Sequence, residues 1–212
     1  MPAPQATIAD DRKSLAAPLA TPVRHPLSRS ERTALRVTVI ATACFGAYGF
    51  STGAPSTTAY LFVVGALGTA LLVRRREPLP TPLCAALPVI AIGHLLGGLV
   101  RVRGGVLYNA SYLHPALRYD HLEHSVAVFV GTFACWYLFS SSLGGAVRAR
   151  HALVVFVLAG LGLGALNEMI EFLSTLAHSG SHVGGYTNTG WDLVSNLAGA
   201  GAAGLCIHRT AR

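Results

Sequence analysis

Charged side chains are scarce in this sequence, and the scarcity excludes most classes of soluble protein. Only 12% of the 212 residues are charged, whereas a soluble domain carries about 25%. Hydrophobic residues make up 52% of the chain, and the mean hydropathy is +0.50. The net charge of +7 comes from basic residues beside apolar runs. We therefore attribute it to membrane orientation and lipid headgroup contact, and not to nucleic acid binding.

Cysteine is also scarce, and familiar catalytic motifs are missing. The four cysteines lie in four different apolar runs without a C-x-x-C pair, which is typical of buried free thiols. The sequence contains no Walker loop, nucleophile elbow, H-E-x-x-H motif or internal repeat. Residues 1–32 are polar and basic and lack the apolar core of a signal peptide. We expect them to form a disordered cytoplasmic tail.

The apolar runs predict an all-α, polytopic transmembrane bundle of about six spans within residues 33–208. The expected spans are 33–50, 57–73, 83–100, 120–139, 151–173 and 191–207. With the N-terminus inside, the outer loops hold only Arg101, Arg103 and Arg118 of the 16 Lys and Arg residues. The positive-inside rule then places both termini in the cytoplasm, and we expect the protein to lie in the inner (plasma) membrane.

The chemistry-bearing residues of the apolar region gather at the expected outer ends of three consecutive spans. Ionisable groups are expensive in lipid, so their presence calls for an explanation. Three pairs have the four-residue spacing that puts both members on one helix face. These pairs are Asp120 and His124, Asn167 and Glu171, and Asp192 and Asn196. We expect the three faces to meet in one pocket, while Glu123 lies on another edge of its helix.

Two interpretations of this pocket stay open. In the first, carboxylates and histidines from several helices form a metal or acid/base site. The candidate catalytic residues are Asp120, His124, Glu168, Glu171 and Asp192, and the candidate ligands of a divalent metal ion are His121, His124, Glu171 and Asp192. Arg101, Arg103 and Asn196 are the candidate substrate-binding residues. In the second interpretation, the same groups neutralise one another and fasten the helices together.

Four segments resemble a known group of membrane proteins. They are His94-Leu95-Leu96-Gly97-Gly98, Tyr119-Asp120-His121 with His124, Asn167-Glu168 with Glu171, and Trp191-Asp192 with Asn196 and Gly199. In order and spacing, over residues 83–207, they resemble the VanZ-like membrane proteins, and most closely those of the YjdF type. The resemblance implies a helical bundle with a polar cluster near its outer face, and a role in the cell envelope.

Three functions are compatible with these observations. The first is an envelope enzyme that acts on a lipid-linked or headgroup substrate, through a divalent metal ion or through acid/base catalysis. The second is a proton- or cation-coupled carrier. The third is a structural or accessory membrane protein without catalysis. The inner halves of most expected spans lack polar residues, which disfavours a continuous ion path and ranks the carrier below the enzyme. The bilayer is the partner in all three.

Overall fold

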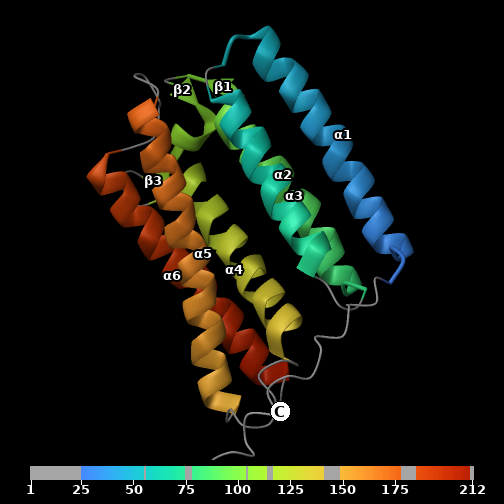
Figure 1. Ribbon diagram of the computed structural model, residues 1–212. Coiled ribbons are helices and arrows are strands. Elements are labelled where there is room, and N and C mark those ends of the chain that lie inside the picture. The colour runs from blue at the N-terminus through green and yellow to red at the C-terminus, as the bar shows by residue number, and fades with distance from the viewer. Residues whose placement is uncertain are drawn as a thin grey trace, which may run out of the picture.

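The computed structural model describes residues 25–54, 56–74, 78–103, 105–113, 117–140, 149–177 and 185–210. Six helices lie side by side and alternate in direction (Figure 1). They are α1 (Arg29–Ser51), α2 (Thr57–Arg74), α3 (Thr81–Leu99), α4 (Tyr119–Phe139), α5 (Ala149–Ala177) and α6 (Tyr186–Thr210). The predicted all-α bundle is therefore confirmed. The predicted tail falls mostly on residues 1–24, which lie outside the described residues.

The helix boundaries differ from the expected ones mainly at the polar ends. Helix α1 begins at Arg29 because Ser28 and Glu31 form a capping box, which satisfies free backbone N–H groups. Helix α6 begins at Tyr186, five residues before the expected start. By length and apolarity, α1, α3, α4 and residues Leu153–Leu173 of α5 qualify as membrane spans, and Thr57–Val73 is a shorter apolar helix.

The segment between α3 and α4 contains short strands that the sequence did not predict. Strand β1 (Arg101–Val102) pairs with β2 (Gly105–Val106), and β3 (Ser111–Leu113) pairs with β4 (Leu117–Arg118), both antiparallel. One 3-10 turn, η2 (Leu107–Asn109), joins the two hairpins. Gly105 has a φ of +142°, which L residues rarely adopt, so glycine lets the first hairpin close over the end of α3.

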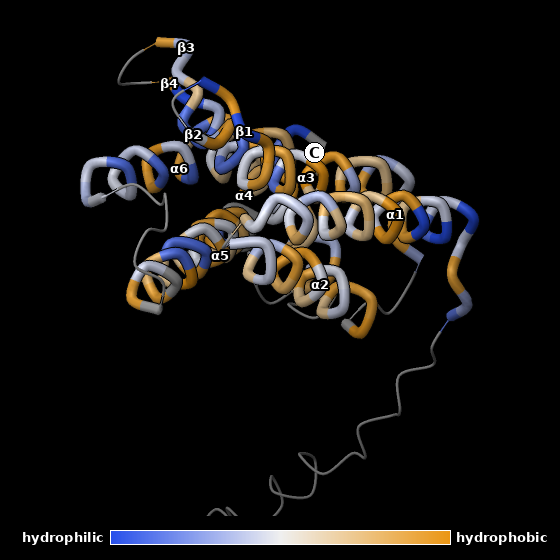
Figure 2. Tube along the Cα trace, turned by 90° about the horizontal axis from the view of Figure 1, so that it is seen from above, coloured by the Kyte–Doolittle hydropathy of each residue, from blue (hydrophilic) through white to orange (hydrophobic). Residues whose placement is uncertain are grey.

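The strands mark one end of the bundle, and the start of α1 and the end of α6 lie at the other (Figure 1). Helix α4 packs against α3, α5 and α6, while α1 packs mainly on α3. Seen from above, α1, α2 and α3 lie on one side and α5 and α6 on the other, with hydrophobic stretches along α1, α2 and α5 (Figure 2). Both helical termini therefore share the face opposite the hairpins.

Polar and apolar side chains are distributed as in a membrane bundle. Phe62, Leu205 and other large apolar side chains are exposed on every helix, whereas Asp192, Asn196 and Thr132 are fully buried. In water such apolar exposure would favour aggregation, but in a bilayer it faces lipid. Away from the hairpins, Glu31 Oε1 accepts the Leu79 N–H at 3.1 Å and so ties α1 to the segment before α3.

Glycine allows a close helix contact between α4 and α6. A Cβ on Gly199 would overlap the backbone carbonyl of Ser125, and the Ser125 hydroxyl donates to the Ser195 carbonyl at 3.0 Å. Gly201, two residues further along α6, has no neighbour within 4 Å of such a Cβ. Gly199 therefore controls the separation of these helices.

We expect Gly199→Ala to lower the free energy of unfolding by about 1–3 kcal/mol, because overpacking forces backbone shifts. Gly201→Ala, the matched control, should leave stability unchanged or raise it, since alanine favours helix by about 1 kcal/mol over glycine. Thermal unfolding in detergent, followed by far-UV circular dichroism, measures both. Equal melting of the two variants would contradict the role of Gly199.

Candidate functional site

The site is built around the imidazole of His124 on α4. Its side chain is 5% exposed, and three helices supply the acidic groups around it. Nε2 lies 3.5 Å from Asp120 Oδ1, 3.8 Å from Glu171 Oε1 and 4.0 Å from Asp192 Oδ1. Three carboxylates from α4, α5 and α6 thus face one nitrogen. We call His124, these three carboxylates, Glu168 and Asn196 the His124 cluster.

The other ring nitrogen of His124 faces a different pair of groups. Nδ1 lies 3.3 Å from Asn196 Oδ1 and 3.4 Å from Glu168 Oε1. Gly164 on α5 makes room for the amide, because a Cβ there would lie 2.6 Å from the Asn196 side chain. The hydrogen bond at Nδ1 fixes the orientation of the ring, with Nε2 toward the three carboxylates.

Asn188 holds two of the carboxylates in place, and the sequence analysis did not identify it. Its amide nitrogen donates to Asp120 Oδ2 at 3.0 Å and to Asp192 Oδ2 at 2.6 Å. Its carbonyl oxygen accepts from Arg118 at 3.1 Å. Asn188 precedes Asp192 by four residues, so the spacing was a usable signal. It was missed because α6 was expected to begin only at Trp191.

The hydrogen bonds of the His124 cluster are incomplete. Asp192 Oδ1 and Glu168 Oε1 are buried, and neither has a hydrogen-bond partner among the described residues. The two side chains are 0% and 8% exposed. Buried polar atoms in folded proteins are nearly always satisfied by protein, water or an ion. The orphaned oxygens therefore mark a position that suits a cation.

Two overlapping groups of potential metal ligands share His124. Asp120, His124 and Asp192 form one group, and His124, Glu168 and Glu171 form the other, each with ligand atoms within 4.8 Å of one another. Neither of these groups includes His121. Its Nδ1 accepts the Arg118 N–H at 3.2 Å, its Nε2 lies 3.8 Å from Asp192 Oδ1, and its ring stacks on Trp191. His121 thus contacts Asp192 without belonging to either group of potential ligands.

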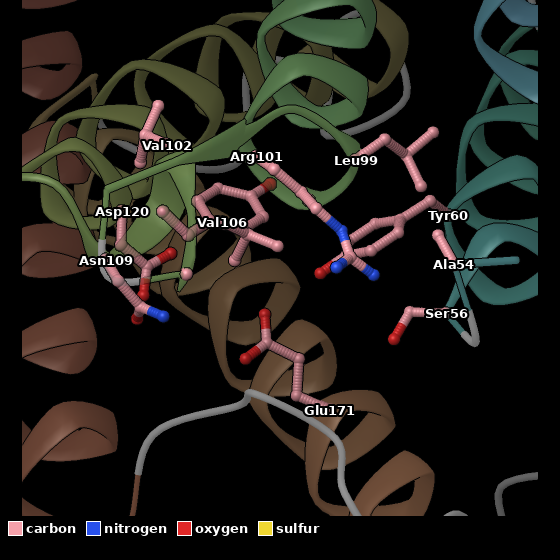
Figure 3. A pocket seen from close by; sticks show the side chains of 13 residues that line it. Ala54, Ser56, Tyr60, Leu99, Arg101, Val102, Val106, Asn109, Asp120 and Glu171 are labelled. Atoms are coloured by element: carbon pink, nitrogen blue, oxygen red, sulfur yellow. The ribbon is translucent and has the colours of Figure 1, made fainter. Parts of the chain in front are cut away.

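A cavity of about 290 Å³ adjoins the His124 cluster (Figure 3). Asp120 and Glu171 line it, and Arg101 from β1 and Tyr60 from α2 face them across the space. Of the two arginines proposed for substrate binding, only Arg101 lines this cavity; Arg103 is exposed in the turn after β1. The cavity therefore combines one cationic group with two carboxylates of the cluster.

Two tyrosines form the inner wall of this cavity and rest on glycines of α3. A Cβ on Gly97 would overlap the Tyr108 ring, and one on Gly98 the Tyr60 ring. The Tyr108 hydroxyl lies 2.6 Å from His94 Nδ1. Burial raises the pKa of Tyr108 well above its usual range, with a further contribution from the charge of Glu123. The phenol is therefore neutral and able to donate a hydrogen bond.

Comparison with known proteins agrees with the membrane architecture. Residues 33–212 match the family described as "Predicted membrane protein (DUF2238)". The chain belongs to the DUF2238 family. No curated protein and no solved structure matches it. This DUF2238 protein is therefore a membrane protein by family and by its apolar helices, while the roles of its candidate site residues stay predictions.

In this DUF2238 protein, Asn188→Ala should lower the free energy of unfolding by about 1–3 kcal/mol, because it leaves two buried carboxylates without their donor. Thr187→Ala, at the exposed neighbouring position, is the control. Thermal unfolding in detergent, followed by tryptophan fluorescence, gives both values. A melting temperature for Asn188→Ala equal to that of the control would exclude Asn188 as a structural part of the site.

Proposed function

We propose that this protein is a metal-dependent enzyme of the inner membrane that acts on a phosphate-bearing lipid headgroup at the outer leaflet. One observation carries the proposal: Asp120 and Glu171 belong both to the His124 cluster and to the wall of the cavity that Arg101 faces. A cation held by the cluster would be within reach of a ligand in the cavity.

A divalent cation suits the cluster better than a proton alone. Ligand atoms about 2.1 Å from a tetrahedral Zn²⁺ lie about 3.4 Å apart, close to the 3.5–4.0 Å between His124 Nε2 and the three carboxylates. Protonating the imidazole would supply one positive charge to the four neighbouring carboxyl groups, whereas a divalent cation supplies two. Asn196, at Nδ1, matches the outer partner that orients a metal-bound histidine.

The bound cation would polarise a phosphoryl oxygen and lower the pKa of a coordinated water. Arg101 supplies a planar, permanently charged group for the remaining phosphate oxygens. The neutral Tyr108 phenol, held by His94 at 2.6 Å, limits how deeply a headgroup enters the cavity. These residues support a hydrolase or a group-transfer enzyme of phospholipids or lipid-linked phosphates.

The distribution of basic residues supports an outer location for the site. Arg101, Arg103 and Arg118 are at the hairpin end, and the basic starts of α1 and α5 and the basic end of α6 are at the other end. The positive-inside rule then puts the hairpins outside. The resemblance to VanZ-like proteins of the YjdF type supports the inner membrane and the cell envelope.

The carrier interpretation has less support. Inward from the cluster, a groove runs from Glu123 on α4 to Glu31 near the start of α1. His94 and Asn167 line the groove beside Glu123, and between this end and Glu31 the polar side chains among the described lining residues are those of Thr38 and Cys84. A proton or cation relay needs closely spaced polar groups through the bundle. The site is therefore better suited to chemistry at one face.

Metal analysis tests the proposal against the purely structural alternative. We expect the purified protein to bind about one equivalent of Zn²⁺ or Mn²⁺. Asp120→Asn and Glu171→Gln should each weaken binding at least tenfold, since each removes a ligand. Glu123→Gln, which changes an acidic residue next to His124 outside the cluster, is the matched control. Isothermal titration calorimetry on the metal-stripped protein measures all four affinities.

Two results would refute the metal proposal. One is the absence of saturable binding by the folded wild-type protein, and the other is equal affinity in all three variants. In either case, wild-type melting temperatures of Asp120→Asn and Glu171→Gln would also show that the cluster is not required to hold the helices together.

The cavity is tested separately with a soluble phosphate-bearing lipid. Arg101→Gln should weaken binding of dihexanoyl phosphatidic acid by about tenfold, because a hydrogen bond to a charged group is worth about 1.5–3 kcal/mol. Arg103→Gln, in the same hairpin but outside the cavity lining, should bind like the wild type. Microscale thermophoresis provides the dissociation constants. Equal losses in both variants would indicate general surface charge and not a site at Arg101.

A further inference from the structure

A second space lies inward of the cavity and is almost entirely apolar. This groove, of about 210 Å³, is formed by facing sides of α1, α2 and α3 and reaches α4 and α5 at one end. Its walls are aliphatic side chains, among them Leu35, Val64, Leu67, Leu71, Leu87 and Ile90. Its chemistry matches a hydrocarbon chain and excludes a hydrated ion.

The end of the groove at α4 and α5 is lined by polar side chains and adjoins the cavity. His94, Glu123 and Asn167 line the groove there. Tyr108, which lines the cavity, is bonded to His94 at 2.6 Å, and the Tyr60 ring stands edge-on to His94 with centroids 4.9 Å apart. Two tyrosines of the cavity wall are therefore in direct contact with His94, which belongs to the groove wall.

An unpartnered ring nitrogen marks the junction. The Tyr108 hydroxyl lies 2.6 Å from His94 Nδ1 and donates to the His94 carbonyl oxygen at 3.2 Å, so Nε2 is the other polar atom of the ring. That nitrogen is buried and has no hydrogen-bond partner among the described residues. A groove that only contacted bulk lipid tails would hold no such group at its end. The junction suits a molecule that changes from polar to apolar at this level.

The dimensions agree with one extended lipid chain. Along α3 the groove runs from Cys84 to His94, about 15 Å at 1.5 Å per residue. Leu99, in the cavity wall, lies about 8 Å beyond His94 on the same scale. Groove and cavity together therefore span about 23 Å along α3. This length is greater than half of the ~30 Å hydrocarbon core and less than its full thickness. A chain extending inward from the outer cavity thus remains inside the bilayer.

We propose that cavity and groove together bind one anionic diacyl phospholipid, with its phosphate beside Arg101 and one acyl chain between α2 and α3. The phosphate half rests on the proposed function, whereas the chain half follows from the groove itself. Arg101 supplies the charge complementarity, and the contact of Tyr60 and Tyr108 with His94 places the two spaces next to each other, which suits an amphiphile. The hydrocarbon chain would then lie among α1, α2 and α3, which fold against one another around it.

Glycines of α2 provide a matched pair of variants for the test. Gly68 lines the groove and Gly65 does not, and a Cβ at either position would have no neighbour within 4 Å. Gly68→Phe therefore fills the groove without displacing the backbone, and Gly65→Phe adds the same ring to the same helix outside it.

The experiment uses the full chain in phosphatidylcholine vesicles that contain a few per cent of phosphatidylglycerol with a diazirine on one acyl chain. Mass spectrometry after illumination should find labelling in α2 and in residues 84–94 at least tenfold above that of exposed Leu205 on α6. Gly68→Phe should remove at least nine-tenths of this labelling, and Gly65→Phe should keep it. Equal labelling of groove and Leu205, or loss in both variants, would overturn the proposal.

The remaining outcomes separate this inference from the proposed function. An absence of lipid adducts, together with dimers formed by a bifunctional cysteine cross-linker between cysteines placed in α2, would assign the groove to a second copy of the chain and overturn the lipid proposal. Specific labelling in a protein that binds no metal supports the lipid site and refutes the metal-dependent enzyme. Metal binding together with labelling spread evenly over the bundle supports the metal-dependent enzyme and refutes the lipid site.

Discussion

The concentration of carboxylates around one buried imidazole is the constraint on which the outer half of this bundle depends. Four acidic side chains from three helices lie within 4 Å of His124. In an apolar setting each charge must be matched by an opposite charge or a donor. Gly164 accordingly lets Asn196 reach His124, and Gly199 lets α6 approach the backbone of α4. Close helix packing here serves polar contacts.

The opposite half of the bundle follows a different rule. Leu79, Leu83, Cys84 and Val130 form its small core, and Glu31 ties α1 to the segment before α3. Between α1, α2 and α3 the packing leaves an apolar groove. The polar half is thus held by hydrogen bonds and ion pairs, whereas the apolar half leaves a groove lined by aliphatic side chains. Tyr108 of the cavity wall and His94 of the groove wall are in contact where the two halves adjoin.

Sequence periodicity predicted the helices and the shared faces because both depend on local geometry. Asp120 and His124, four residues apart, do lie together. The rotation of each helix about its axis depends on tertiary packing. Residue spacing therefore could not show that Glu168 faces His124 or that His121 contacts Asp192. Arg101 and Arg103 were equivalent in the sequence, and the hairpin fold alone separates them. Asn188 was hidden by an error in the start of α6.

The buried oxygens of Asp192 and Glu168 help to decide whether the His124 cluster only holds helices together or forms a binding site. A network that only joined helices would be selected to satisfy its buried atoms, because each orphan costs about 1–3 kcal/mol. It would also be sealed from the surroundings. Here two buried oxygens of the cluster lack a hydrogen-bond partner among the described residues, and Asp120 and Glu171 also line a cavity. Both features have a physical reason if a cation completes the cluster and a ligand reaches it through the cavity.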